Sequence, residues 1–186
     1  IARLGSAEAI FKEKRQSLLK IEGIGELKLQ ALFDPANFEA AEKEIEFIKN
    51  EHLETHYFLD ENYPEKLKHC HDSPIILFSR GNIQLNNRRI VSVVGTRKIT
   101  SAGKTFVTQF IEELSPLNPI IVSGFAYGVD IAAHRAAIDC NLQTIGCLAH
   151  GLDQIYPKLH AKYVDDVLKI EFSITREDYE YWPMPV

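Results

Sequence analysis

Residues 89–106 read RIVSVVGTRKITSAGKTF, and residues 118–134 read NPIIVSGFAYGVDIAAH. In each stretch a short apolar, β-branched run leads into a glycine turn and then into a segment with helical spacing. This pattern predicts two consecutive strand–turn–helix units, with strands at residues 90–94 and 120–123. Such units form a parallel sheet whose turns meet at one edge, and open α/β sheets bind ligands at that edge.

The sequence after these two units predicts a third of the same kind. An alanine-rich helix is expected at residues 129–140, a strand at 143–149, a loop at 150–158 and a helix near 159–168. The helix after the first strand is expected to bury Phe106, Val107, Phe110, Ile111 and Leu114. The predicted fold class is therefore α/β, with a largely parallel sheet covered by helices on both faces.

The first 54 residues read as helical, and short strands are expected at residues 55–59 and 74–82. Between two predicted helices, Gly23-Ile24-Gly25 resembles the turn of a helix-hairpin-helix, as in small SAM-like helical domains. That turn can approach a phosphate, with Lys28 adding charge. Leu29 stands where the motif usually has a small residue, so packing is the preferred role and contact with a DNA backbone the alternative.

The predicted division of the chain is a helical domain at residues 1–54, an α/β domain at 55–170 and an acidic, unassigned tail at 171–186. Hydrophobic residues make up 45% of the 186 residues and charged residues 25%, which is ordinary globular composition. No apolar run reaches the roughly 20 residues of a membrane helix, and the N-terminus lacks the apolar centre of a signal peptide. We therefore expect a cytoplasmic protein.

The cysteines and histidines do not predict a metal site. Cys70, Cys140 and Cys147 have no metal or disulfide spacing. His69-Cys70-His71 suggests zinc, but three adjacent ligands close poorly on one tetrahedral ion and no fourth ligand is suitably spaced. We interpret that cluster as incidental and predict neither a metal nor a cofactor.

The charge distribution is uneven. The formal net charge is −5, yet residues 73–111 contain no Asp or Glu. The same segment contains six bases: Arg80, Arg88, Arg89, Arg97, Lys98 and Lys104. A basic face on an acidic protein suits a phosphate or polyanion ligand, whereas the alternative is a chance scarcity of acids in a strand-rich segment.

The predicted turns offer groups that bind anions. Gly95 allows a tight turn, and Arg97 carries a fork of donors suited to phosphate oxygens. Ser123-Gly124 and Gly128 precede a helix N-terminus, and Lys158 follows the third strand at the same edge. Each base alone could simply be solvated beside a turn, but their convergence at one edge favours an anion site.

Other motifs are weaker. Gly103-Lys104-Thr105 resembles the end of a P-loop, but the glycine required five residues earlier is Lys98, and no G-x-G-x-x-G is present. Asp130 and His134 stand one helical turn apart and could form an acid–base pair. We prefer structural roles, with Asp130 at the helix N-terminus and His134 hydrogen-bonded to a neighbouring loop, because no nucleophile completes a mechanism. No catalytic residue is assigned.

Taken together, three motifs resemble the DNA-processing protein A family (DprA, also called Smf): VVGTR at residues 93–97, SGFAYGVDIAAH at 123–134 and GLDQIYP at 151–157. Residues 62–67 and 72–78 are similar to the lead-in to that family's Rossmann-like domain, and the helical N-terminus to its small first domain. The similarity covers most of residues 15–165.

The resemblance implies a Rossmann-like protein that is not an enzyme and binds single-stranded DNA without strong sequence preference. It implies a role in natural transformation, delivery of DNA to a RecA-type recombinase, and a homodimer. Arg97 and Lys158 would then be the main phosphate contacts. The full set of candidate DNA- and phosphate-binding residues is Gly95, Thr96, Arg97, Lys98, Ser123, Gly124, Gly128 and Lys158.

The sequence departs from the family pattern in two places. Thr96 stands where the family usually has serine, and the family's Phe-Pro-x-Arg-Asn-Arg stretch with its following strands is absent. We therefore expect part of the wall of the DNA pocket to be missing from this chain. The alternative functions are a related nucleotide-monophosphate phosphoribohydrolase, which would carry a Pro-Gly-Gly-x-Gly-Thr turn and a catalytic Glu, and a non-catalytic nucleotide sensor.

Overall fold

The structure is a computed structural model that describes residues 3–81, 85, 88–154, 157–164 and 173–177. The chain divides into two compact units, residues 1–51 and 52–186. No helix in the part of the chain that the structure describes is both long enough and apolar enough to cross a membrane.

The first unit is helical, as predicted. It consists of α1 (Ala7–Lys12), α2 (Arg15–Leu18), α3 (Glu26–Leu32) and α4 (Pro35–Asn50). The Asp34 side chain accepts a hydrogen bond from the Ala36 amide at 2.9 Å and so caps α4, whose first residue is a proline. This combination is typical of a helix start, because proline lacks the amide hydrogen that the first turn leaves unpaired.

The hairpin turn between α2 and α3 is held by the chain itself. Gly23 has a φ of +81°, and the Lys28 ammonium donates to the Gly23 carbonyl at 2.9 Å. Leu18 and Leu29 are fully buried, with exposed fractions of 0% and 1%. The burial of Leu18 and Leu29 fits the packing role preferred for this turn, and Lys28 contacts the turn that it was expected to charge.

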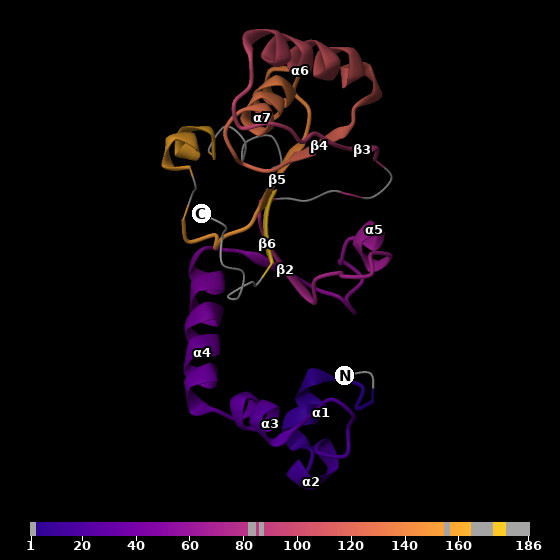
Figure 1. The fold of residues 1–186 in the computed structure, drawn as a ribbon, viewed down its shortest axis with the longest axis vertical. Helices are drawn as coiled ribbons and strands as arrows, with labels where there is room; N and C mark the ends of the chain where they lie inside the picture. The colour runs from indigo at the N-terminus through magenta and orange to yellow at the C-terminus, as the bar shows by residue number, and fades with distance from the viewer. Residues whose placement is uncertain (1–2, 82–84, 86–87, 155–156, 165–172, 178–186) are drawn as a thin grey trace. The chain divides into compact units, whose positions relative to one another are not determined.

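The second unit is built on a six-stranded mixed sheet. The strands are β1 (Glu54–Tyr57), β2 (Ile76–Arg80), β3 (Ile90–Ser92), β4 (Ile120–Ser123), β5 (Thr144–Leu148) and β6 (Ser173–Glu177). Their order across the sheet is β1-β2-β6-β5-β4-β3 (Figure 1). Strands β3 to β6 run parallel, while β2 is antiparallel to both of its neighbours.

Strand β6 lies in the middle of the sheet, between β2 and β5. The segment at residues 171–186 is unassigned from the sequence, and β6 lies within it. Its register pairs Leu77 of β2 with Glu177, and Leu148 of β5 with Arg176. Residues 173–177 therefore join the antiparallel half of the sheet to the parallel half.

The remaining helices are α5 (Glu65–Lys68), α6 (Ser101–Leu114), α7 (Val129–Asp139) and the 3-10 turns η1 (Ser115–Leu117) and η2 (Lys158–His160). Residues 161–164 continue η2 as helix, and the rest of the helix predicted near 159–168 falls outside the described residues. Thr100 caps α6, since its hydroxyl accepts from the Gly103 amide at 3.1 Å. Gly103-Lys104-Thr105 therefore lies inside α6 rather than in a loop before it.

Helices α6 and α7 lie side by side, and their shared core includes residues of the parallel strands (Figure 1). Val107 and Ile111 of α6 pack against Ile121 of β4. Helix α7 contributes four small side chains to this core: Ala132, Ala133, Ala136 and Ala137. Small residues let a helix approach its neighbours closely, and the alanine-rich helix expected at residues 129–140 is confirmed as α7.

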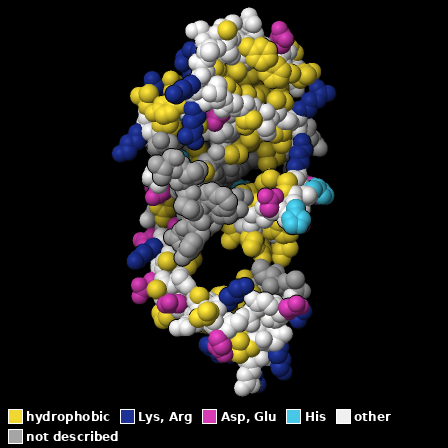
Figure 2. All heavy atoms as spheres, viewed as in Figure 1, with side chains coloured by type: hydrophobic (Ala, Val, Ile, Leu, Met, Phe, Trp, Pro, Cys, Tyr) yellow, Lys and Arg dark blue, Asp and Glu magenta, His cyan; other side chains and the backbone are white. Residues whose placement is uncertain are grey.

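The predicted burial of Phe106 and Phe110 was wrong. Phe106 is 67% exposed and Phe110 39%, and their rings stack on each other with centroids 6.2 Å apart. Leu114 is only partly buried. Since β3 is the last strand of the sheet, the core covers one narrow stripe of α6 and leaves these rings in solvent. Figure 2 shows hydrophobic side chains gathered on the surface at the α6 end of this unit.

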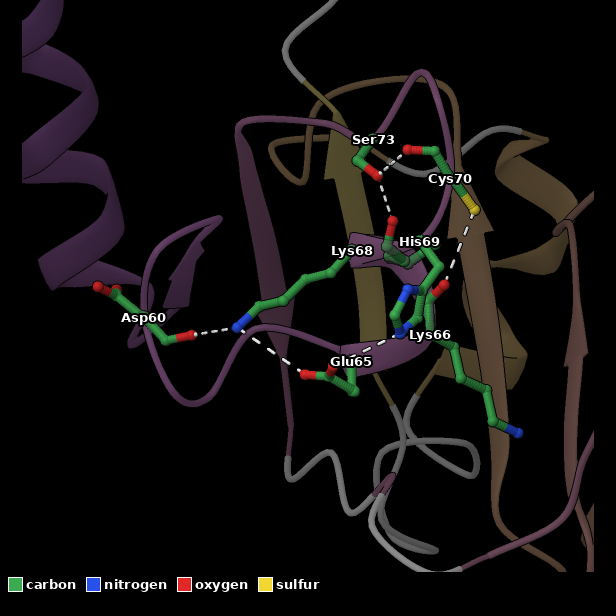
Figure 3. A network of polar contacts seen from close by, with 8 residues as sticks. Asp60, Glu65, Lys66, Lys68, His69, Cys70 and Ser73 are labelled. Atoms are coloured by element: carbon green, nitrogen blue, oxygen red, sulfur yellow. Dashed lines mark hydrogen bonds and ion pairs between the residues drawn. The ribbon is translucent and has the colours of Figure 1, made fainter. Parts of the chain in front are cut away.

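The His69-Cys70-His71 segment follows α5, and the side chains of His69 and Cys70 have separate partners (Figure 3). The His69 ring lies 3.6 Å from the Glu65 carboxylate, one turn earlier, and the Cys70 thiol faces the Lys66 carbonyl at 3.8 Å. The Ser73 hydroxyl donates to the Cys70 carbonyl at 2.8 Å, which closes the turn. Among the residues described, no group of three or more His, Cys, Asp or Glu side chains is gathered to hold a metal ion.

Candidate functional site

The carboxyl ends of β3 and β4 are tied together by two hydrogen bonds. The Val93 amide donates to the Val122 carbonyl at 2.8 Å, and the Ser123 hydroxyl donates to the Val93 carbonyl at 2.6 Å. Ser123 is only 2% exposed. Its one hydroxyl hydrogen is thus used between the strands, so Ser123 sets the spacing of the two turns rather than offering a donor to a ligand.

The turn after β4 packs directly on the turn after β3, and Gly128 makes the contact. A β-carbon built on Gly128 would lie 2.8 Å from Arg97 Cα and 2.7 Å from the Arg97 carbonyl carbon. Gly128 also has a φ of +86°, a conformation that side-chain-bearing residues rarely adopt. The Val129 amide donates to the Thr96 carbonyl at 3.1 Å. Together these contacts lock the backbone of Thr96 and Arg97 in place.

The first turn presents its side chains outward. Gly95, Thr96, Arg97 and Lys98 are all exposed. The Thr96 hydroxyl accepts from the Lys98 amide at 3.1 Å, which stabilises the turn. A serine has the same hydroxyl, so the threonine here keeps the contact that the family's usual residue would make. At Gly95 an added β-carbon would meet a Val129 methyl group at 2.6 Å, which explains why this position has no side chain.

The first amide of α7 is already bonded within the chain, and a carboxylate lies in the first turn of the helix. The Val129 amide is bonded to Thr96, and Asp130 lies in the first turn, as predicted. A β-carbon on Gly124 would lie 2.5 Å from an Asp130 carboxylate oxygen, so that carboxylate sits beside the second turn. An incoming anion at this edge would therefore depend on the exposed cations more than on the end of α7.

His134 of α7 is completely buried and braces the second turn. Its Nε2 lies 2.6 Å from the Gly124 carbonyl, and its Nδ1 lies 2.7 Å from the Thr144 hydroxyl. Burial lowers the pKa of His134 to about 4, although the hydrogen bond to Gly124 acts in the opposite direction. A carbonyl can only accept, so Nε2 carries the proton of the neutral ring. The predicted bond from His134 to a neighbouring loop is confirmed.

His160 braces the same turn from the other side, a role that the sequence did not reveal. It is 3% exposed, and its Nδ1 donates to the Phe125 carbonyl at 2.7 Å. It lies in η2, only two residues after Lys158, whose side chain is exposed. The third loop is therefore fixed to the second turn. In the sequence, His160 is simply a histidine that follows Tyr-Pro-Lys-Leu, and nothing there distinguishes it from a surface histidine.

The six bases of the acid-free segment do not form one face. Arg88 donates to the Gln143 side chain at 2.5 Å and to the Asn118 side chain at 2.9 Å, at the opposite edge of the parallel strands. Arg80 reaches the Leu152 carbonyl at 3.5 Å. Of the six, Arg97 and Lys98 lie in the turn after β3. Lys158, from outside the segment, lies in η2, which is fixed to the turn after β4 through His160.

Comparison with known proteins places the chain in a family. A family model described as DNA recombination-mediator protein A matches residues 54–183. The chain belongs to this family. It is 34% identical to DNA processing protein DprA of Bacillus subtilis (strain 168) over 122 residues, which cover 65% of this chain and 41% of that protein. It is 39% identical to DprA of Streptococcus pneumoniae (strain R6) over 107 residues, 58% of this chain and 38% of that one.

Solved structures of the family share the fold. DprA from Streptococcus pneumoniae superposes with a TM-score of 0.62 at 32% identity, covering 82% of this chain and 53% of that one. DprA from Helicobacter pylori, in a structure described for its single-stranded DNA-binding mode, superposes with a TM-score of 0.59 at 31% identity. The match covers 72% of this chain and 59% of that one. The predicted Rossmann-like fold class is thus confirmed. The aligned residues span about two fifths of the curated relatives' length.

Proposed function

We propose that this chain binds single-stranded DNA through its phosphates, at the edge formed by the turns after β3, β4 and β5. The observation that carries the proposal is the exposed Arg97 on a turn whose backbone is locked by Gly128. A fixed backbone leaves only the side chain of Arg97 to be ordered when a phosphate binds, and the planar fork of its guanidinium matches two phosphate oxygens. The DNA-processing relatives and the Helicobacter pylori structure support DNA as the anion.

Each candidate residue has a distinct proposed part. Arg97, Lys98 and Lys158 contact phosphates, since all three are exposed. Thr96 shapes the turn that carries Arg97, and the glycines allow the close approach of the turns. Ser123 fixes the spacing of β3 and β4 through its bond to Val93. No chemical step is assigned to these residues, so the proposed role is binding and not catalysis.

The cellular role that we propose follows the family's description as a recombination mediator. The protein would take up single strands during natural transformation, protect them and deliver them to a RecA-type recombinase, acting as a homodimer. Sedimentation of the chain, alone and with DNA, measures the dimer. Strand-exchange assays with a recombinase and a single-strand-binding protein measure delivery.

The binding site is tested by fluorescence anisotropy with labelled oligo-dT and a duplex of equal length at two salt concentrations. We expect preference for the single strand and an affinity that falls steeply with salt, because phosphate contacts release counterions. Arg97→Ala and Lys158→Ala should each weaken binding to every sequence and lower the slope of log affinity against log salt by about 0.7.

Arg89→Ala is the matched control. Arg89 is another exposed base of the acid-free segment, but it precedes β3 and so lies at the opposite edge of the parallel strands. Its loss should leave the affinity nearly unchanged. The site assignment fails if Arg97→Ala and Lys158→Ala bind oligo-dT as well as the parent. Release of free base from adenosine monophosphate by the parent would instead indicate the phosphoribohydrolase alternative.

A further inference from the structure

An exposed aromatic side chain belongs to the turn after β4, which packs on the turn that carries Arg97. Tyr127 is 43% exposed and immediately precedes Gly128. Because a β-carbon on Gly128 would lie 2.8 Å from Arg97 Cα, adding a bond of about 1.5 Å and a Cα spacing of about 3.8 Å puts the Cα atoms of Tyr127 and Arg97 within about 8 Å of each other. Tyr127 therefore lies in a turn whose backbone neighbours the turn that carries Arg97.

The Tyr127 ring is supported by a buried residue of η2. The Tyr127 and His160 rings meet with centroids 4.9 Å apart and planes at 71°. His160 is itself fixed by its bond to the Phe125 carbonyl and lies two residues after Lys158. Tyr127 is thus held by the same contact that fixes the Lys158 segment, while more than a third of its surface stays open to solvent.

The surroundings of this ring combine aromatic groups and positive charge. Tyr163 lies 6.1 Å from His160, ring to ring. The Arg135 guanidinium is 5.6 Å from the centroid of Tyr163, and the Lys162 ammonium is 5.0 Å from it. Both cations are exposed. Positive charge that follows the backbone and open aromatic rings on which bases stack are the two components of surfaces that bind single strands.

We propose that Tyr127 is a base-stacking residue: a nucleobase of the bound strand lies on its ring while neighbouring phosphates contact Arg97 and Lys158. The inference rests on the proposed function and adds a subsite for bases to it. It explains why an exposed tyrosine is held rigidly at an edge where phosphate contacts alone need no aromatic ring. It also accounts for a preference for single strands, since the bases of a duplex are stacked on each other.

The test compares two ligands of equal length and charge, oligo-dT and an abasic oligonucleotide, in binding to the full chain. Tyr127→Ala should lose about 5- to 100-fold in affinity for oligo-dT, as expected for one stacked base, and bind the abasic strand like the parent. Tyr127→Phe should keep the parent's affinity. The salt slope of Tyr127→Ala should equal that of the parent, because no phosphate contact is lost.

Phe110→Ala is the control for loss of an exposed ring, since Phe110 is 39% exposed and lies on α6, nine residues into that helix. It should leave both affinities unchanged. Oligonucleotides carrying 2-aminopurine add a spectroscopic readout, because stacking on Tyr127 quenches the probe and Tyr127→Ala should restore its fluorescence.

The outcomes separate the two proposals. If Arg97→Ala loses affinity for both ligands while Tyr127→Ala binds oligo-dT as tightly as the parent, the base subsite is refuted and the phosphate site stands. If Tyr127→Ala weakens binding to the abasic strand equally, the ring only supports the turn, and the stacking proposal is again refuted. If Arg97→Ala alters neither affinity, the proposed function itself fails.

Discussion

Acid should weaken the α/β unit through one buried side chain, His134. Its ring bridges the Gly124 carbonyl after β4 and the Thr144 hydroxyl of β5, and it is fully buried. Because burial lowers its pKa from 6.5 to about 4, the folded protein keeps this ring neutral in mildly acidic solution. The unfolded chain, by contrast, takes up a proton below about pH 6.5.

The different pKa of His134 in the folded and unfolded states determines how much the free energy of unfolding changes with pH, and in which direction. Above pH 6.5 the ring is neutral in both states, and its contribution to stability is complete. As the pH falls from 6.5 toward 4, only the unfolded state gains the proton, so the free energy of unfolding decreases. At about 1.4 kcal/mol per pKa unit, the full loss is about 3 kcal/mol, and most of it is reached by pH 4.5.

Urea denaturation of the parent and of His134→Gln at several pH values between 7 and 4.5 measures this effect. Glutamine does not titrate, and its amide can donate to the Gly124 carbonyl. The variant should be less stable at pH 7, but the stability difference between parent and variant should shrink by about 2 to 3 kcal/mol at pH 4.5. Carboxylates titrate in both proteins and cancel in this difference.

An NMR titration of the His134 ring gives the direct readout, with a midpoint expected near pH 4. A midpoint near 6.5 would refute the reasoning, because the ring would then gain its proton as readily when folded as when unfolded. A stability difference between parent and variant that stays constant with pH would refute it independently. Either result would mean that burial of His134 does not restrict its protonation.

Two further pairs of substitutions test the packing of the α/β unit. Gly128→Ala should destabilise the protein by at least about 2 kcal/mol, because its φ of +86° strains any side chain and the added methyl group meets the Arg97 backbone. Gly124→Ala is its control, since the added group meets the movable Asp130 carboxylate; equal melting temperatures for the two variants would contradict the locked turn. Phe106→Ser should cost less than about 1 kcal/mol because the ring is 67% exposed, whereas Ile111→Ala, at 0% exposed, should cost about 2 to 5. Urea denaturation measures both, and a larger loss for Phe106→Ser than for Ile111→Ala would contradict the observed burial.

The parallel part of the fold could be predicted because local signals agree there. Residues 120–123 form an apolar, β-branched run between Pro119 and Gly124, and the structure places β4 at the same residues. The strand predicted at 90–94 is shorter, Ile90–Ser92, since Val93 already begins the turn toward Gly95. The meeting of the turns at one edge follows from parallel topology alone, whatever side chains they carry.

What could not be predicted depends on partners that are distant in sequence. Helical spacing put Phe106 on the apolar stripe of α6, but the neighbouring strand is the last of the sheet, and nothing local signals that. Arg88 is part of a basic run, yet it bonds to the side chains of Gln143 and Asn118 at the edge of the parallel strands opposite the candidate site. His160 is buried, and its Nδ1 donates to the carbonyl of Phe125, which lies 35 residues earlier in the chain.

The central position of β6 has a consequence for the order in which the chain folds. Leu77 pairs with Glu177, one hundred residues later, so closing this contact fixes a very long loop. Until residues 173–177 have been synthesised and inserted, β2 and β5 are both open edges with unpaired backbone groups, which invite strands of other chains. Formation of the complete sheet should therefore be a late and slow event, and the nascent chain is most prone to aggregate just before it.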